Sequence, residues 1–241
     1  MSDTGRMRTA TSIFRPLLAG LALALLAGCA STAKTPADPY EGFNRKMFAV
    51  NEGLDAVVAK PLAKGYDAVT PLPVKAGVGN FFGNLGDAWI GGNNLLQGKL
   101  ADGASDFGRL LMNSTMGLFG LFDVASEFGI EKHDEDFGQT LGRWGVGEGG
   151  YVFLPILGPR TLRDAGGWVV DSSVDPVRRY DDVPVRNSAL GLRFVDIRAS
   201  LLPADRVIEE AAFDKYSYIR DAYLQRRRSQ VADGRISRQD D

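Results

Sequence analysis

The sequence predicts a mainly α-helical domain that follows an N-terminal secretion leader. Apolar residues recur at steps of three and four in several segments, which is typical of amphipathic helices. Strand patterns are scarce: one short apolar stretch at 151–157 contains a proline and predicts at most a short hairpin. No apolar run after the leader reaches about 18 residues, so we predict no single membrane-spanning helix there.

The leader has the parts of a bacterial lipoprotein signal. Arg6, Arg8 and Arg15 supply positive charge around an apolar run at 17–27, which is too short to cross a bilayer. Leu-Ala-Gly-Cys at 26–29 matches the lipobox, in which the cysteine thiol accepts a diacylglyceryl group. We therefore predict a signal peptide at 1–28, cut before Cys29, and a lipidated tether at 29–37. An ordinary secretory signal with an incidental cysteine is the alternative.

Localisation and charge follow from the same region. The residue after Cys29 is Ala30. An aspartate at this position commonly retains lipoproteins at the inner membrane, and this sequence lacks it. We therefore expect the outer membrane of a Gram-negative bacterium, with acyl chains such as palmitate anchoring the protein on the periplasmic side. Loss of the leader changes the formal charge from -2 to about -4, which argues against a nucleic-acid partner.

The predicted helices follow one another along residues 38–225. The first begins after Asp38-Pro39, carries apolar residues from Phe43 onward, and is predicted to end at Lys60-Pro61. Later segments with the same spacing lie at 85–96, 100–111, 162–169, 190–201 and 213–223. The charged stretch at 226–241 predicts a disordered tail.

Residues 80–128 have an unusual composition for a soluble domain. Their apolar clusters are separated by glycine and asparagine more often than by charged residues. Small residues allow apolar helices to approach closely, as they do in membranes. Two interpretations stay open: helices that lie in one leaflet of a membrane, or ordinary core segments.

Motifs for catalysis or cofactor binding are weak. The glycine run at 145–150 fits a dinucleotide-binding spacing, but no helix pattern follows it, so we interpret it as a tight loop. His133 is the only histidine, and neither zinc-binding thiolates nor a G-x-S-x-G elbow accompanies it. It lies in an acidic run at 131–136 that we expect to be a solvated loop. We therefore predict no enzyme activity, no cofactor and no metal.

A set of longer motifs resembles the MlaA (VacJ) family of outer-membrane lipoproteins. In chain order they are DPYEGFNRKMF at 38–48, NFFGNL at 80–85, LQG at 96–98, DFGQTLG at 136–142, WGVG at 144–147, LP at 154–155, LGP at 157–159 and LRD at 162–164. The resemblance covers about residues 38–226. It departs from the family at Gly150, where a proline is usual.

The resemblance implies a ring-shaped helical domain, partly embedded in the membrane, with an amphipathic channel. It implies non-enzymatic removal of mislocalised phospholipid from the outer leaflet of the outer membrane. The phospholipid would pass to a soluble periplasmic lipid-carrier protein, and the ring would lie beside a trimeric porin. A structural lipoprotein that scaffolds a porin or envelope complex without moving lipid is the alternative.

The resemblance also suggests candidate site residues. Phe43 and Asn44 would pin the first helix and control opening, and segments within 80–128 would form the membrane-dipping rim. A mobile loop at the channel mouth would contain Gly142, Trp144, Gly145, Gly147 and Gly150. Basic residues of the last helix would dock the carrier: Arg220, Arg226 and Arg227.

Overall fold

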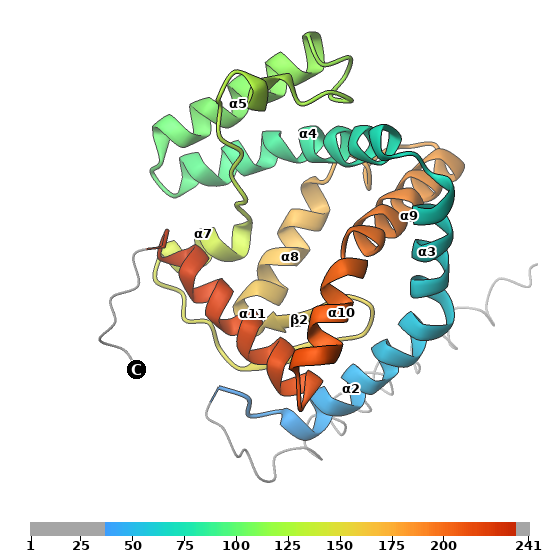
Figure 1. Cartoon of the computed structure of the whole chain (residues 1–241). Coiled ribbons are helices and arrows are strands. Elements are labelled where there is room, and N and C mark those ends of the chain that lie inside the picture. The colour runs from blue at the N-terminus through green and yellow to red at the C-terminus, as the bar shows by residue number, and fades with distance from the viewer. Residues whose placement is uncertain (1–36, 235–241) are drawn as a thin grey trace, which may run out of the picture.

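The computed structural model describes residues 37–234, so the predicted signal peptide and Cys29 lie outside the described residues. Within that range the chain is mainly helical, as predicted (Figure 1). In order, its elements are α2 (Glu41–Leu54), η1 (Asp55–Ala59), α3 (Lys60–Val69), α4 (Leu72–Leu96), α5 (Leu100–Thr115), α6 (Val124–Glu127), α7 (Phe137–Arg143), β1 (Tyr151–Leu154), β2 (Gly158–Thr161), α8 (Leu162–Val174), α9 (Val183–Ser200), α10 (Leu202–Ala211) and α11 (Lys215–Val231).

Helix α2 runs through η1 into α3, so the predicted helix end at Lys60-Pro61 is wrong. The segment η1 is a turn of π-helix, which has a wider hydrogen-bond spacing and ends two residues before Pro61. Pro61 lies in the first turn of α3, where its ring and its missing N–H group are tolerated. The helix ends at Val69, ahead of Pro71, which caps the start of α4.

The elements close a ring of contacts. One arc consists of α2, η1, α3 and α4, with a short turn between α3 and α4 (Figure 1). From there α4 contacts α7, α7 contacts α11, α11 contacts β2, and β1 contacts α2, which completes the circuit. Helices α9 and α10 lie against α3, and α8 packs on α7. The ring-shaped, mainly α domain expected from the resemblance is confirmed.

The strands β1 and β2 form the short hairpin that the apolar stretch allowed. They pair antiparallel, with Tyr151 opposite Thr161. Pro155 falls in the connecting turn, where no ladder hydrogen bond is needed. Tyr151 and Phe153 pack with Tyr216 of α11 in a small apolar cluster, so the hairpin joins the first and last helices of the ring.

Helix α11 continues to Val231, so the predicted tail begins too early at residue 226. Arg227 is buried and forms ion pairs with Asp136 at 2.5 Å and Asp164 at 3.0 Å. These pairs tie the last turns of α11 to α7 and α8. Asp136 and Asp164 are distant from Arg227 in the sequence. The run of charges after residue 225 therefore resembled a solvated C-terminal end.

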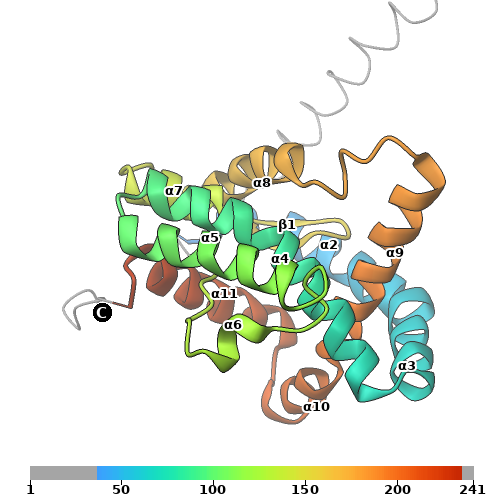
Figure 2. The ribbon, with the colours of Figure 1, turned by 90° about the horizontal axis from the view of Figure 1, so that it is seen from above.

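Helices α4 and α5 lie side by side as a hairpin in both views (Figures 1 and 2). Glycines allow this close approach: a Cβ atom on Gly91 would lie 3.2 Å from the carbonyl oxygen of Gly103. Between the two helices, Asn94 donates a hydrogen bond to Asp106 at 2.7 Å. Among residues 37–234, no helix combines the length and hydropathy needed to cross a membrane.

The crossing of α7 and α8 generates a stability prediction. A Cβ atom on Gly167 would lie 2.5 Å from the backbone nitrogen of Gly138, and backbone cannot move aside as a side chain can. We expect Gly167→Ala to lower the free energy of unfolding by about 1–3 kcal/mol in detergent. The neighbouring Gly166 has open space around its Cα. Gly166→Ala is the matched control and should be neutral or stabilising by about 1 kcal/mol; equal effects would contradict the proposed crossing.

Candidate functional site

The interior of the described structure is unusually polar. Its buried side chains comprise fifteen polar or charged residues and only ten apolar ones, whereas soluble domains bury mainly apolar residues. Buried polar groups need hydrogen-bond partners. Arg109 shows how they find them: it is fully buried and donates to both carboxylate oxygens of Asp123, at 2.8 and 3.0 Å. The polar groups therefore form networks that hold the helices together.

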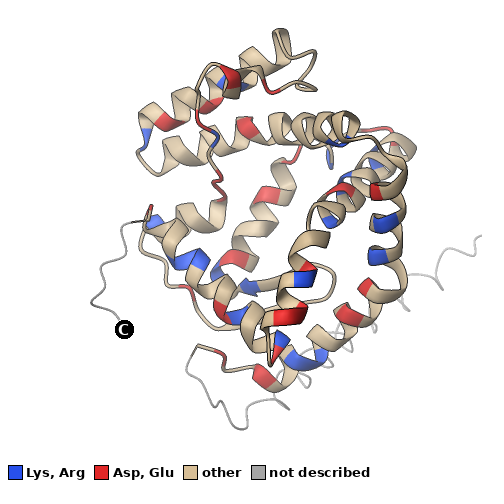
Figure 3. Cartoon of the chain, viewed as in Figure 1, with Lys and Arg blue, Asp and Glu red and all other residues tan. Residues whose placement is uncertain are grey.

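Large apolar side chains lie on the surface instead. One set, the α2–α3 stripe, consists of Val50, Leu54, Val57, Val58, Leu62 and Val69. A second set, the α5 tip, follows α5 and consists of Met116, Leu118, Phe119, Leu121 and Phe122. Few charged residues lie along α4, whereas many lie on α3, α9, α10 and α11 (Figure 3). Exposed apolar patches of this kind mark contact with a membrane or another protein.

The α5 tip has a fixed backbone that points its apolar side chains outward. Leu118 and Phe119 have positive φ angles of 50° and 59°, and Gly120 follows at 87°. The turn is closed by hydrogen bonds from the Gly120 N–H to the Asn113 carbonyl at 2.9 Å and from the Phe122 N–H to the Gly117 carbonyl at 2.9 Å. Phe119 is 79% exposed. A left-handed backbone is costly for such residues, so a constraint other than local preference favours this turn.

Asn44 pins α2 to the hairpin. Its side chain is fully buried and donates to the Tyr151 carbonyl at 3.0 Å and to Asp38 at 2.8 Å. It also accepts from the Phe153 N–H at 2.8 Å. Phe43, the preceding residue of α2, is half-buried. The predicted pin is therefore carried by the amide of Asn44.

Sequence reasoning missed a second amide two turns further along α2. Asn51 donates to the Leu154 carbonyl at 2.9 Å and accepts from the Ile156 N–H at 2.8 Å. The spacing of seven residues from Asn44 places both amides on one helix face, and that spacing was visible in the sequence. Together the two asparagines hold the whole length of the hairpin.

Two of the three predicted docking arginines are internal. Arg220 is buried and lies 3.4 Å from Asp38, which also accepts from the Tyr216 hydroxyl at 2.5 Å. Arg227 is buried in its ion pairs with α7 and α8. Neither can present its charge to a partner on the surface. Arg226 is exposed, 3.0 Å from Asp134, so the docking idea is left with this residue alone.

The predicted mouth loop is attached at both ends. Trp144 donates its indole N–H to the Leu96 carbonyl at 3.0 Å, and Arg228 pairs with Glu148 at 2.9 Å. The Cβ of a residue other than glycine at 150 would meet Pro39 at 2.8 Å. Between these points, Gly145 and Gly147 have open space around them. The backbone N–H groups of Gly145 and Val146 also donate to carbonyls of α7, at 3.0 and 2.9 Å, so Gly147 has the fewest contacts in the loop.

The acidic run at 131–136 is not the solvated loop that we expected. Glu135 pairs with Lys99 at 3.0 Å, and Asp136 pairs with Arg227. The His133 Nδ1 atom lies 2.8 Å from Asp106. The loop is therefore fastened to α5 and α11 by charges that the local sequence does not reveal. No group of three or more metal-ligating side chains occurs among residues 37–234.

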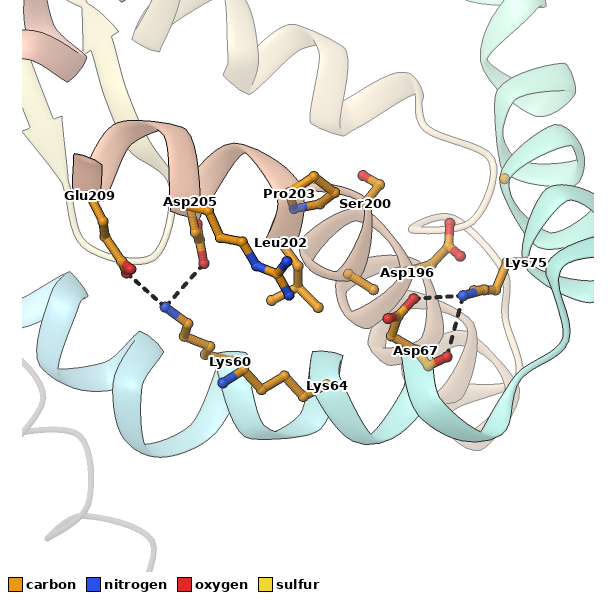
Figure 4. A pocket seen from close by; sticks show the side chains of 13 residues that line it. Lys60, Lys64, Asp67, Lys75, Asp196, Ser200, Leu202, Pro203, Asp205 and Glu209 are labelled. Atoms are coloured by element: carbon orange, nitrogen blue, oxygen red, sulfur yellow. Dashed lines mark hydrogen bonds and ion pairs between the residues drawn. The ribbon is translucent and has the colours of Figure 1, made fainter. Parts of the chain in front are cut away.

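A charged pocket of about 760 Å³ lies between α3, the start of α4, the end of α9, and α10 (Figure 4). We call it the α3–α10 pocket. Ion pairs line part of it: Lys60 lies 3.3 Å from Asp205 and 3.0 Å from Glu209, and Lys75 lies 2.6 Å from Asp67. The remaining lining residues are Lys64, Gly79, Asp196, Ala199, Ser200, Leu202, Pro203 and Arg206. Four cationic and four anionic side chains therefore face one space.

The Asn44 pin generates a second prediction. Asn44→Ala removes three hydrogen bonds and leaves a buried N–H group and a buried carbonyl without their partner. We expect a loss of about 2–3 kcal/mol in the free energy of unfolding. The control is Asn187→Ala, an exposed asparagine of α9, which should change stability by less than about 0.5 kcal/mol. Comparable losses in both variants would show that Asn44 has no special role.

Asp164 generates a prediction about pH. Burial opposes its ionisation, but the charge and hydrogen bonds of Arg227 hold the pKa of Asp164 below its usual range. A lowered pKa stabilises the fold above the unfolded-state pKa of about 3.9, and this stabilisation is lost as pH falls. The stability difference between the wild type and Asp164→Asn, measured by denaturant unfolding, should therefore shrink between about pH 5 and pH 3. A difference that grows on acidification would contradict the ion pair.

Comparison with known proteins places this structure in a family. Residues 36–230 match the family model described as MlaA lipoprotein. The chain is 37% identical to the intermembrane phospholipid transport system lipoprotein MlaA of Shigella flexneri, over 87% of this chain and 86% of the relative. The protein of the same description in Haemophilus influenzae is 33% identical, over 95% of this chain and 94% of the relative. A solved structure described as the structural basis for maintenance of bacterial outer membrane lipid asymmetry superposes with a TM-score of 0.71 at 34% identity, over 80% of this chain and 98% of that one. The chain therefore belongs to the MlaA lipoprotein family.

Proposed function

We propose that this protein removes mislocalised phospholipid from the outer leaflet of the outer membrane and passes it toward the periplasm without chemical change. The observation that carries the proposal is the reversed distribution of side chains, with polar groups buried between the helices and large apolar groups exposed on the surface. The MlaA relatives named for intermembrane phospholipid transport support the same function.

The physical task explains this distribution. A phospholipid has a charged headgroup and apolar chains, and moving the headgroup through hydrocarbon without polar partners is costly. A ring with polar inner walls lowers that cost, while its apolar surface is stabilised by lipid. The α5 tip and the α2–α3 stripe would lie in the membrane. The charged helices α9, α10 and α11 would face the passage and the periplasm.

Opening of the passage would depend on the first helix. Asn44 and Asn51 join α2 to the hairpin, and the same hairpin packs on α11. Release of the Asn44 amide would therefore loosen the ring where its first and last helices meet. The loop around Gly147, which has open space around its Cα, would supply the mobile part of the mouth.

The partners follow from the same proposal. Acylated Cys29 would hold the protein on the periplasmic side of the outer membrane and would serve mainly for delivery there. A trimeric porin would surround part of the apolar surface, and a periplasmic lipid carrier would receive the phospholipid near Arg226. The proposal requires no nucleic acid, cofactor or metal.

Two other functions predict different measurements. A structural scaffold for a porin would carry no lipid, so mass spectrometry of lipid extracted from the purified protein separates it from a transporter. A lipid-cleaving enzyme would need His133 as its base, with the Asp106 carboxylate, 2.8 Å from the His133 Nδ1 atom, orienting the ring. Replacement of His133 by alanine with no change in lipid handling would exclude that role.

The α5 tip provides the test of this proposal. We expect a strain that lacks the protein to expose phospholipid on the cell surface, measured by labelling with an amine reagent that does not cross the membrane. The wild-type chain should restore low labelling, and the double variant Phe119→Asp, Phe122→Asp should not, because charged groups in hydrocarbon cost about 2–3 kcal/mol each.

The matched control places the same charges on exposed positions at the end of α8 and in the loop after it, as Ser173→Asp and Tyr180→Asp. This control should restore low labelling. Unchanged labelling in the strain that lacks the protein would refute the function, and full activity of the tip variant would refute insertion of the tip.

A further inference from the structure

The α3–α10 pocket contains two cations without carboxylate partners. Lys60 and Lys75 are neutralised by ion pairs across the pocket. For Lys64 of α3 and Arg206 of α10, no ion pair occurs within residues 37–234. They come from two neighbouring helices, and both line the same cavity. Their combined charge is thus available to an anion that enters the pocket.

The same pocket contains a carboxylate without a cationic partner. Asp196 of α9 accepts one hydrogen bond, from the Tyr66 hydroxyl to its Oδ1 atom at 2.8 Å. Its Oδ2 atom faces Gly79, where an added Cβ would lie 3.7 Å away. Within the described part of the chain Asp196 forms no ion pair. The Tyr66 hydrogen bond fixes the carboxylate and leaves its second oxygen free to accept a cation's N–H groups.

We propose that the α3–α10 pocket binds a zwitterionic phosphodiester, with the phosphate at Lys64 and Arg206 and the ammonium group at Asp196. A phospholipid headgroup of the ethanolamine type has this chemistry, so the inference rests on the proposed function and names the substrate class that it handles. The volume of about 760 Å³ is in the range of small-molecule sites.

The balance of charge in the pocket supports a zwitterion over a simple anion. Four cationic and four anionic side chains line it, and the internal ion pairs leave charge of both signs available. A ligand with phosphate alone would leave Asp196 unmatched beside it. Arginine and lysine form charge-assisted hydrogen bonds to phosphate, and these bonds are stronger than neutral ones.

The test uses the full-length lipidated protein in vesicles that contain phosphatidylethanolamine with a photoreactive group next to the glycerol. We expect Lys64→Ala with Arg206→Ala to lower photolabelling at the pocket about tenfold. The control is Lys46→Ala with Arg179→Ala, which removes the same two side-chain types from exposed positions outside the pocket. It should label as the wild type does. Equal labelling in all three proteins would overturn the proposal.

The ammonium contact has its own variant. Asp196→Asn keeps the shape of the side chain and removes its charge. We expect the ratio of phosphatidylethanolamine to phosphatidylglycerol labelling to fall about fivefold or more. An unchanged ratio would overturn the assignment of the ammonium group to Asp196.

Experiments with soluble glycerophosphoethanolamine distinguish a site for a lipid headgroup from a site for a free phosphodiester. If the soluble compound reduces the lipid labelling, and this labelling depends on Lys64 and Arg206, the result supports a headgroup site. Binding of the soluble compound without any lipid labelling at the pocket would mean a free phosphodiester site, which overturns the lipid assignment. If wild-type protein takes up no phospholipid anywhere, the proposed transport fails; titration with the soluble compound still decides whether these residues bind a phosphodiester.

Discussion

Polar groups that are shielded from water are stabilised by hydrogen-bond partners, and this preference organises the contacts between the helices. The helices meet through asparagine, aspartate and arginine side chains rather than through a continuous apolar core. Asn44 joins α2 to the hairpin, Asn94 joins α4 to α5, and Arg227 joins α11 to α7 and α8. Such networks are specific in geometry, and a single missing partner is costly. The ring therefore depends on a few exact pairings between distant segments.

The same preference explains the surface. With polar side chains used inside, large apolar residues remain outside, where water would not favour them. A surrounding lipid phase, as proposed above, would resolve this conflict and would give the α5 tip, with its left-handed turn, a reason to present phenylalanine outward. The charged α3–α10 pocket then gives the headgroup a place to bind during passage.

The sequence was sufficient to predict the helical class, the short hairpin and the family, because these depend on local periodicity and on contiguous motifs. It also identified Asn44, although two of the three partners of this residue, Tyr151 and Phe153, lie more than 100 positions away. Local sequence patterns gave wrong predictions where a charged residue has its partner in a distant segment of the chain. Arg227 belonged to an apparently disordered tail, and His133 to an apparently solvated loop, because Asp164 and Asp106 come from other helices. The helix continues past Pro61 because a π-helical turn precedes it, and the spacing of apolar residues in the sequence does not indicate such a turn.

The central claim is that the apolar surface lies in lipid while the charged pocket lies in water. Spin labels at single cysteines test it most directly, since Cys29 is the only cysteine of the sequence and would be acylated. Val57→Cys, Phe119→Cys and Ser200→Cys place labels on the α2–α3 stripe, on the α5 tip and in the pocket. In reconstituted vesicles, the first two labels should collide mainly with dissolved oxygen and the third mainly with a water-soluble nickel chelate. The same aqueous accessibility at all three positions would contradict the account.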